Sequence, residues 1–581
     1  MTESSTSASR RALLGLGGVA ALSALASQAS AASAAPLAAA PASAPAPASA
    51  SRPPASPRAV AFRPMLGGGP STADESAALG MPAAAAAEVP VGKQYTTFRA
   101  AALAARRTPT PLFDAGTAKS HLLRRATFGP RAKDVADLKK LGIDGWLERQ
   151  LNPTKIAQTD AAAWTSFPLA FGSSAKILAN SKDYSWDGML QTCYAALGLQ
   201  VFSNRQLFEI TVDIFANHLH VPMPGEQWAT GPDYLKNVIR KHAFGKYSSM
   251  LRAAMKHPAM LSYLNNDESR KAHVNENLGR ELLELHTVGI AGGYTEDDVK
   301  NSARILSGRS WEGWLERYRS TYGQYRYKAN DHYVGAVKVL GFTHENASAS
   351  GGEAVGDAYL DYLARHPATA QKIARKIAVR FVSDSPSSDL VNRLAAVYLK
   401  HDTDIRQVVR AVFLSSDFWS ATGMRMRRPL EDAVGAARVL GVTRGTDVKK
   451  ALSHLYWSLN ESGQTPYGWM PPNGYPDVAA AWLGAGAMIS RWNVHRNFIW
   501  WGYAFGRTEA HKLVTQTTTM TADAWLRAIS TKLLGVPMSE AHRRAVLAGA
   551  DLRPGDVMRS HWWKSGRAVA LVLDSPYFQL R

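Results

Sequence analysis

From residue 117 onwards, the sequence repeats the spacing of amphipathic α-helices in segments that end at glycine or proline. Gly129 ends the first segment, Pro130 begins the next, and Gly142 closes it. The pattern breaks at 309–342, where tryptophans and tyrosines cluster without helical spacing. The sequence therefore predicts an all-α fold: a large multi-helix globular domain with a short β-hairpin or aromatic insert.

The same spacing places the remaining helices. Thr295 is expected to cap a helix whose first turn carries Glu296, Asp297 and Asp298. Gly-rich 350–356 and Pro/Gly-rich 463–477 are expected to be loops. Helices are predicted at 187–203, 204–220, 231–241, 245–256, 258–265, 275–289, 357–365, 367–382, 388–400, 404–414, 429–440, 447–459, 478–486 and 490–504.

The N-terminal part has a different composition. Ser9-Arg10-Arg11-Ala12-Leu13-Leu14, followed by a short apolar run, is typical of a twin-arginine signal peptide, which we place at 1–34. Residues 35–112 are rich in Ala, Pro and Ser and predict a disordered linker. The helical domain then covers 113–581, as one body or as two lobes with a boundary near 420–428. We expect a secreted or envelope-associated protein without a transmembrane segment after signal removal.

Charge and cysteine content restrict the classes of partner and cofactor. Residues 113–581 hold 58 Lys/Arg against 43 Asp/Glu, a net +15, which favours anionic partners such as acidic polymers or lipid head groups. The sequence contains no run of five basic residues, the pattern that would indicate nucleic-acid binding. Cys193 is the only cysteine, which excludes an internal disulfide, a thiolate zinc site and c-type haem. We expect it to be a buried apolar filler. Nucleotide-binding motifs are also missing.

The stretch 275–289 is the main candidate for chemistry. On a helix its polar side chains share an arc of about 140°. The spacing lets Arg280 bridge Glu276 and Glu284. A buried cluster of this kind would suit a catalytic base or a metal ligand, whereas an exposed one would be an ordinary ion-pair ladder. The arc contains Glu276, Asn277, Arg280, Glu281, Glu284 and Thr287, with Asn275 beside it.

Histidines provide a second set of candidates. Asn217-His218 lies in an apolar segment, where His218 could be a general base or a ligand, or simply a core histidine. His286 points away from Glu284 on a regular helix and is expected to pack in the core. A carboxylate and histidine site joining these helices would suit a divalent metal, although the spacing selects no particular one.

Aromatic residues of the last third, including Trp482, Trp492, Trp500 and Trp501, allow two interpretations. At helical spacing they are more often core residues, and this is the interpretation we favour. The alternative is a groove that binds sugars.

Nine short motifs follow one another along the helical part of the sequence. They are His121-Leu-Leu-Arg-Arg-Ala-Thr-Phe-Gly129, Asn204-Arg-Gln-Leu207, Asn217-His218, His257-Pro-Ala-Met-Leu261, Asn275-Glu-Asn277, Arg280-Glu-Leu-Leu-Glu-Leu-His286, Gly292-Gly-Tyr-Thr295, Leu414-Ser-Ser-Asp-Phe418 and Gly463-Gln-Thr-Pro466. Together they resemble the bacterial family called domain of unknown function 1800, from about residue 117 to the end of the sequence. The resemblance implies an exported helical protein, often encoded beside a sulfatase-like exported protein. It also implies that Asn217, His218, Glu276, Arg280, Glu281 and Glu284 matter together.

Two functional hypotheses follow. The first is an envelope or extracellular enzyme that acts on a carbohydrate or acidic polymer. In it Glu281 or Glu284 is the base or ligand, Arg280 orients an anion and His218 assists, with Asn217, Asn275, Glu276 and Asn277 as binding residues. The second is a non-catalytic scaffold that binds a polymer, or a sulfatase-like partner, through its basic surface.

Overall fold

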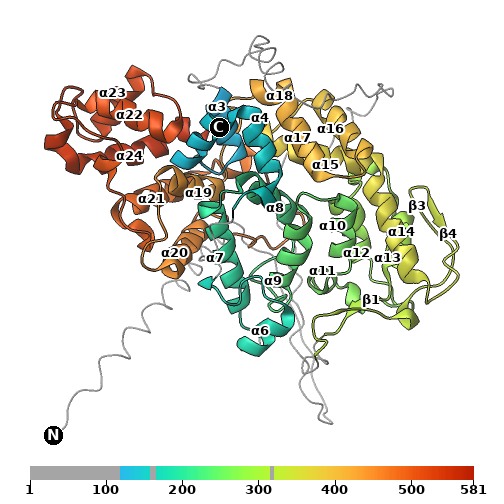
Figure 1. Cartoon of the computed structure of the whole chain (residues 1–581). Helices are drawn as coiled ribbons and strands as arrows, with labels where there is room; N and C mark the ends of the chain where they lie inside the picture. Colours follow the sequence, from blue (N-terminus) through green and yellow to red (C-terminus); the bar gives the residue numbers. More distant parts are fainter. Residues whose placement is uncertain (1–117, 158–164, 183, 314–319) are drawn as a thin grey trace, which may run out of the picture. The chain divides into compact units, whose positions relative to one another are not determined.

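The structure, a computed structural model, describes residues 118–157, 165–182, 184–313 and 320–581 (Figure 1). All of them belong to one compact unit. The signal peptide (1–34) and the linker (35–112) predicted from the sequence lie outside the described residues. The fold is mostly helical, with short strands only in the predicted aromatic insert, as expected.

The first helices include the segment with the predicted break. Gly142 has φ +70 and interrupts α4, so that two helical stretches meet at a kink. The helices of this part are α3 (Ala118–Ala126), α4 (Ala132–Leu151), α6 (Ser174–Asn180), α7 (Asp187–Phe202) and α8 (Gln206–His218).

Two π-helical turns mark the middle of the chain. They are η4 (Leu235–Arg240) and η6 (Leu282–His286), and η6 continues α12 directly. Thr295 forms the predicted cap, since its hydroxyl accepts from Asp298 N and the Asp298 carboxylate accepts from Thr295 N. The α-helices here are α9 (Gly231–Tyr234), α10 (Tyr247–Ala254), α11 (Pro258–Tyr263), α12 (Asn277–Glu281) and α13 (Glu296–Leu306).

The aromatic insert forms two small antiparallel hairpins. Strand β1 (Arg309–Trp311) pairs with β2 (Tyr325–Tyr327), and β3 (Val337–Val339) pairs with β4 (Phe342–His344). The predicted 350–356 loop is wrong, because α14 already begins at Gly352. A Cβ at Gly352 would overlap the His332 ring, so this glycine allows the helix to pack closely against the insert.

The helices that follow the insert pack on one another in sequence order (Figure 1). They are α14 (Gly352–Arg365), α15 (Pro367–Phe381), α16 (Ser388–Lys400), α17 (Ile405–Leu414) and α18 (Ser416–Ser420).

The last part of the chain differs from prediction at one place. The expected 478–486 helix is only a 3₁₀ turn, η10 (Ala479–Trp482), and α21 starts after Gly484. The Trp482 indole donates to Pro476 O and holds this turn against the loop that precedes it. The other elements are α19 (Pro429–Val439), α20 (Val448–Glu461), α21 (Ala485–Trp500), η11 (Gly502–Ala504), η12 (Ala510–Lys512), α22 (Ala522–Leu534), α23 (Glu540–Gly549), η13 (Met558–Lys564), α24 (Ser565–Asp574) and α25 (Pro576–Gln579).

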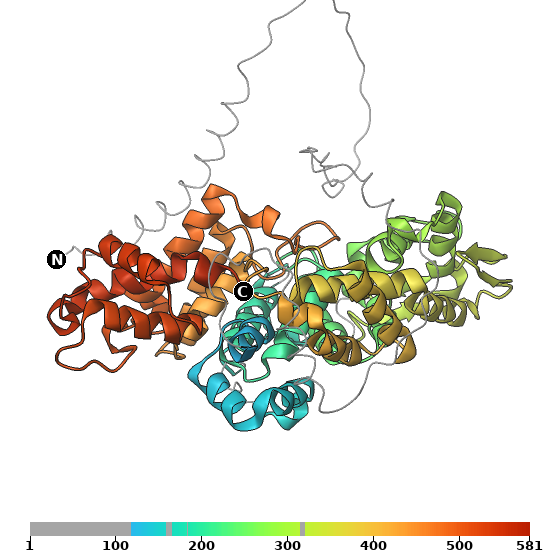
Figure 2. The same cartoon turned by 90° about the horizontal axis from the view of Figure 1, so that it is seen from above.

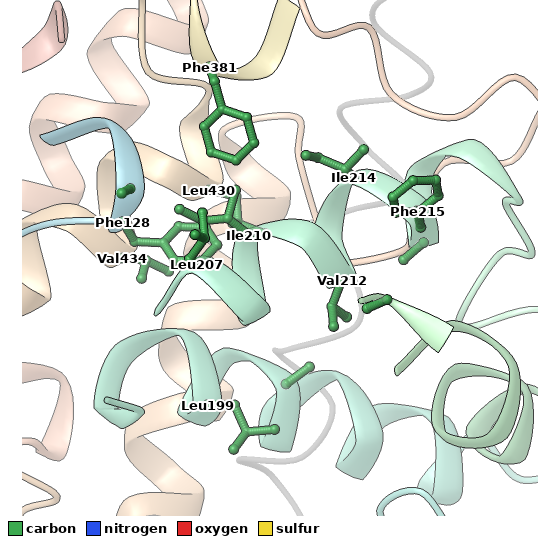
Figure 3. Packing of buried hydrophobic residues seen from close by; sticks show 14 of the residues in the cluster. Phe128, Leu199, Leu207, Ile210, Val212, Ile214, Phe215, Phe381, Leu430 and Val434 are labelled. Atoms are coloured by element: carbon green, nitrogen blue, oxygen red, sulfur yellow. The ribbon is translucent and has the colours of Figure 1, made fainter. Parts of the chain in front are cut away.

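Helix α8 lies within the hydrophobic core and is buried on nearly every side. Figure 3 shows its apolar side chains among residues from α7, α15, α19 and the end of α3. Its polar side chains are buried as well: Glu209 pairs with Arg240 and Asp213 with Arg428, so no face of this helix has to turn to water. The residues labelled there are Phe128, Leu199, Leu207, Ile210, Val212, Ile214, Phe215, Phe381, Leu430 and Val434.

The last residues return to the start of the helical region. Arg581 exchanges two backbone hydrogen bonds with Arg425, and Arg427 N donates to Gln579 O. The Arg124 guanidinium of α3 donates to Tyr577 O and Leu580 O. The end of the chain therefore lies beside α3, as both views show (Figures 1 and 2). Whether 113–581 forms two lobes stays a prediction.

None of the described helices is both long enough and apolar enough to cross a bilayer. Cys193 is fully buried and forms no disulfide, in agreement with its predicted role as a core residue.

Candidate functional site

The predicted site segment is a short α-helix that widens into a π-turn. Asn275 Oδ1 accepts from Asn277 N at 2.9 Å and starts α12, so these asparagines organise the first turn. From Leu282 to His286 the helix is π-helical. A π-turn bonds residue i to i+5, which rotates the later side chains away from the positions that a regular helix gives them. Such turns often occur at functional sites.

Arg280 forms its ion pairs near the surface. Its guanidinium bonds both oxygens of Glu296 at 2.7 Å and reaches Glu276 at 3.4 Å. The expected bridge from Glu276 to Glu284 is wrong, because Glu296 of α13 replaces Glu284 as the second partner. All three side chains are at least one-third exposed, so each pair contributes less than about 1 kcal/mol.

Glu281 and Glu284 form a separate acidic pair. Glu284 accepts a hydrogen bond from the Tyr294 hydroxyl at 3.2 Å. Burial, and then the charge of Glu284, raise the pKa of Glu281. Burial and Glu284 likewise raise the pKa of Tyr294 to about 12. Of the predicted acids, Glu281 is therefore the one whose protonated form the protein favours.

His218 contacts the π-turn through its backbone. His218 Nε2 lies 3.1 Å from His286 O, and His286 Nδ1 lies 3.1 Å from His218 O. The Tyr247 hydroxyl is 3.0 Å from the same Nε2. Burial, and then Lys376, lower the pKa of His218, and burial lowers that of His286 to about 3. Both imidazoles are neutral and join α8 to η6, and the expectation of a core His286 is confirmed.

Asn217 supports the loop at 463–477. Its side-chain oxygen accepts from Tyr475 N, and its nitrogen donates to Tyr475 O, both at 2.7 Å. The Asn217 amide thus forms the two hydrogen bonds that a neighbouring strand would form with Tyr475, and it holds the loop on the end of α8. Asn217 thus positions the loop and also lines the cavity described next.

A cavity of about 220 Å³ lies between α8, α15 and the end of that loop. The face of α15 towards it carries three cations at i, i+3 and i+4: Lys372, Arg375 and Lys376. Within the described chain, the side chains of Arg375 and Lys376 form no hydrogen bond and no ion pair. Burial lowers the pKa of Lys376, Asp477 partly opposes this effect, and Arg428 adds to it. We call Lys372, Arg375 and Lys376 the cation row.

The cation row is connected to the predicted acids. The Lys372 ammonium donates to Glu284 O at the widened turn of η6. The row therefore joins the two areas: its first member contacts the segment of Glu281 and Glu284, and the other two face the cavity.

Beneath the cavity lies a buried network of arginines and carboxylates. Arg428 Nη2 lies 2.5 Å from Asp213, and Arg380 Nη1 lies 2.8 Å from Glu431. Burial alone would raise the pKa of Glu431, but Arg380 and Arg581 hold it well below its ordinary value. The network contains Asp213, Arg380, Asp384, Arg425, Arg428, Glu431, Asp477 and Arg581.

This network matches four guanidinium groups with four carboxylates, so the cation row is a net positive excess above it. That arrangement can hold an anion, because the fixed charges below are already neutralised, whereas Arg375 and Lys376 form no ion pair in the described chain.

Sequence reasoning did not identify the network or the cation row. Residues 420–428 were considered only as one possible boundary between two lobes, and their arginines Arg425 and Arg428 are buried. One local signal was present: the Lys-x-x-Arg-Lys spacing of 372–376 places three cations on one face of α15.

Metal ligation finds no support in the described part of the chain, where no three His, Cys, Asp or Glu side chains lie close enough to hold an ion.

Comparison with protein-family models gives one match, described as "Protein of unknown function (DUF1800)", over residues 121–580. The match covers most of the chain, which therefore belongs to this family, as the motifs suggested. No curated protein and no solved structure matches it.

Proposed function

We propose that this member of the DUF1800 family is an exported envelope protein that binds an acidic polymer, and that the cation row receives its anionic groups. The observation that carries the proposal is the pair Arg375 and Lys376, two cations at a cavity whose side chains form no hydrogen bond and no ion pair among the described residues. Unpaired cations beside a low-dielectric wall attract anions more strongly than cations in open solvent.

Three further features support an extracellular acidic ligand. The twin-arginine pattern at 9–14 favours export, and the net +15 of 113–581 favours polyanions over the whole surface. The loop at 463–477 forms one side of the cavity and is fixed by Asn217, so the site does not have to be ordered when the ligand binds.

The test compares polygalacturonate with neutral pullulan in a titration of the mature protein. Arg375→Gln together with Lys376→Gln should weaken binding of the acidic polymer about tenfold, and raised salt should weaken it further. The control, Lys139→Gln with Lys140→Gln, removes two exposed charges from α4 and should change binding little. Equal losses in both double variants would assign binding to net charge and contradict the proposal.

A second candidate function is catalysis on the same polymer, with Glu281 as the acid or base. It is favoured by one observation, the raised pKa of a half-buried carboxyl beside Glu284 and next to the cation row. In this version Arg280 and His218 have no direct role, since the Arg280 guanidinium pairs with Glu296 and His218 Nε2 lies against Tyr247 and His286.

Catalysis is tested by following the chain length of polygalacturonate during incubation with the protein. Glu281→Gln should abolish any cleavage without weakening binding, whereas Glu276→Gln should leave cleavage unchanged. An unaltered polymer would leave binding as the function and contradict the catalytic version alone.

A further inference from the structure

The outward face of α21 carries large apolar side chains. Ile489, Trp492, Arg496 and Trp500 are spaced by three, four and four residues, which places them within about 80° of one another on the helix. Ile489 is 54% exposed, Trp492 42% and Trp500 39%. The Arg496 guanidinium lies 6.0 Å from the centroid of the Trp500 ring.

The opposite face of α21 already belongs to the core. Val494, Phe498 and Ile499 are buried there, together with Arg491 and His495. A surface helix of a soluble protein normally turns a polar face to water. Helix α21 thus carries large apolar side chains on its outer side too, beside the exposed Asn493 and Arg496. The expectation that these tryptophans are core residues is wrong for Trp492, Trp500 and Trp501, whereas Trp482 is buried.

Other exposed tryptophans lie in the segments next to α21. Trp501 is 76% exposed, Trp562 49% and Trp563 60%. Helix α24 packs against α21, and a Cβ at Gly566, its second residue, would lie 3.7 Å from the Trp500 ring, directly after the turn that carries Trp562 and Trp563. We call Ile489, Trp492, Trp500, Trp501, Trp562 and Trp563 the tryptophan surface.

Basic side chains surround the tryptophan surface. Residues 485–514 and 551–567 together hold eight Lys/Arg against three Asp/Glu. Arg496, Arg559 and Arg567 are exposed and form no ion pair in the described chain, whereas Glu509 and Asp551 are neutralised by lysines. The surface is therefore apolar at its centre and positively charged around it.

We propose that the tryptophan surface docks the protein on a bilayer rich in anionic lipid, with α21 lying in the plane of the interface. Half-exposed indoles beside arginines suit the boundary between head groups and acyl chains, where the ring is apolar and its N–H stays hydrated. The arginines supply the attraction to acidic head groups.

The geometry favours a lipid surface over a sugar chain. The Trp562 and Trp563 rings are at 87° to each other, so they cannot form one flat platform under a polysaccharide. Insertion into a fluid interface has no such requirement, because each ring is solvated separately. Residues 489–500 extend about 16 Å along the axis of α21, a contact large enough for an interfacial helix.

The test is sedimentation of the full mature protein with vesicles of phosphatidylglycerol and phosphatidylethanolamine, compared with neutral phosphatidylcholine. We expect binding to the anionic vesicles only, and weaker binding at high salt. Trp492→Ser with Trp563→Ser should reduce partitioning about tenfold or more. The control Trp186→Ser removes an equally exposed tryptophan, 55% exposed, from the start of α7 and should bind like the wild type.

A second measurement follows the fluorescence of the wild-type protein and of one further variant. Lipids brominated near the glycerol backbone should quench the tryptophan fluorescence of the wild-type protein, and Arg496→Gln should raise the lipid concentration needed. Wild-type protein that stays in the supernatant, or that pellets equally after both tryptophans are replaced, overturns the proposal. The proposal is also overturned if the wild type does not bind vesicles and the double variant loses retention on polygalacturonate or on a partner protein.

Discussion

Arg380 of α15 and Glu431 of α19 form an ion pair of 2.8 Å in which both side chains are only 1% exposed. Arg581 reaches the same carboxylate, which therefore neutralises guanidinium groups from two distant segments. Glu431 is the centre of the network that lies beneath the cation row. Its ionised state is essential because an arginine cannot be buried cheaply without a counterion.

Replacement of this carboxylate should be severely destabilising. Glu431→Gln removes the shared counterion and should lower the free energy of unfolding by about 3–5 kcal/mol. The matched change Glu276→Gln breaks a half-exposed pair with Arg280 and should cost less than about 1 kcal/mol. Urea denaturation followed by circular dichroism compares the two, and similar midpoints would show that the network is not structurally essential.

Helix α19 approaches the end of α3 without space for a side chain. A Cβ on Gly435 would lie 2.8 Å from Phe128 O. Gly435→Ala should therefore destabilise the protein by about 1–3 kcal/mol. Gly486 lies in α21 with nothing within 4 Å of its Cβ position, so Gly486→Ala should stabilise by up to about 1 kcal/mol. Thermal melts should give shifts of opposite sign, and two shifts of the same sign would contradict the packing.

Stability should fall with rising pH because of His495. Its ring lies between Asp432 and Asp574, at 3.0 and 2.8 Å. Burial alone would lower the pKa of His495, but Asp432 and then Asp574 raise it from 6.5 to about 9. The folded state therefore binds the proton more tightly than the unfolded state does. This contribution, on the order of 3 kcal/mol, is complete below pH 6.5 and is lost as the pH rises through 9.

His495→Gln removes this titration. Urea midpoints of the wild type should decrease between pH 6.5 and 9, and those of the variant should change less. Parallel curves would show that His495 is not protonated in the folded protein.

The hydrogen bonds from Asn217 should control the order of the 463–477 loop. Asn217→Asp replaces the donor to Tyr475 O with a second acceptor, so one of the two 2.7 Å bonds is lost. Amide hydrogen exchange in this loop should accelerate, while α15 and α19 keep their protection. The control Asn180→Asp alters an exposed side chain at the end of α6. Unchanged exchange in the loop would mean that Asn217 does not hold it.

Removing the charge of Glu281, which is partly buried beside Glu284, should stabilise the protein. Its pKa is raised, so the ionised form is less favourable in the folded state than in the unfolded state. This penalty is absent at low pH and develops as the pH rises through the raised pKa. Glu281→Gln should therefore raise the melting temperature at neutral pH and have little effect at pH 4. A lower melting temperature at neutral pH would contradict the raised pKa.

Local sequence patterns predicted the helical elements well. Thr295 with Asp298, and Gly142 between two helical segments, depend only on residues within one or two turns. The prediction of a helix at 478–486 failed because the Trp482 indole is hydrogen-bonded to the preceding loop. The prediction of a loop at 350–356 failed because α14 packs closely against the insert there.

The candidate site was less predictable. The sequence directed attention to 275–289 because of its polar arc, but it could not predict a π-turn, which contacts α8 through His218 and His286. The same limitation explains why Glu296 replaced Glu284 beside Arg280.

The sequence by itself determined an all-α protein of the DUF1800 family, with a buried lone cysteine and an excess of positive charge. Only the tertiary structure decided which charges are neutralised, because the partners lie far apart in the chain: Arg380 and Glu431, or Arg438 and Asp134, which are 304 residues apart. Helical periodicity records the side of a helix on which a residue lies, not the residue that it meets there. The same long-range pairing left Arg375 and Lys376 without a direct ion pair in the described chain and turned the tryptophans of α21 to the surface.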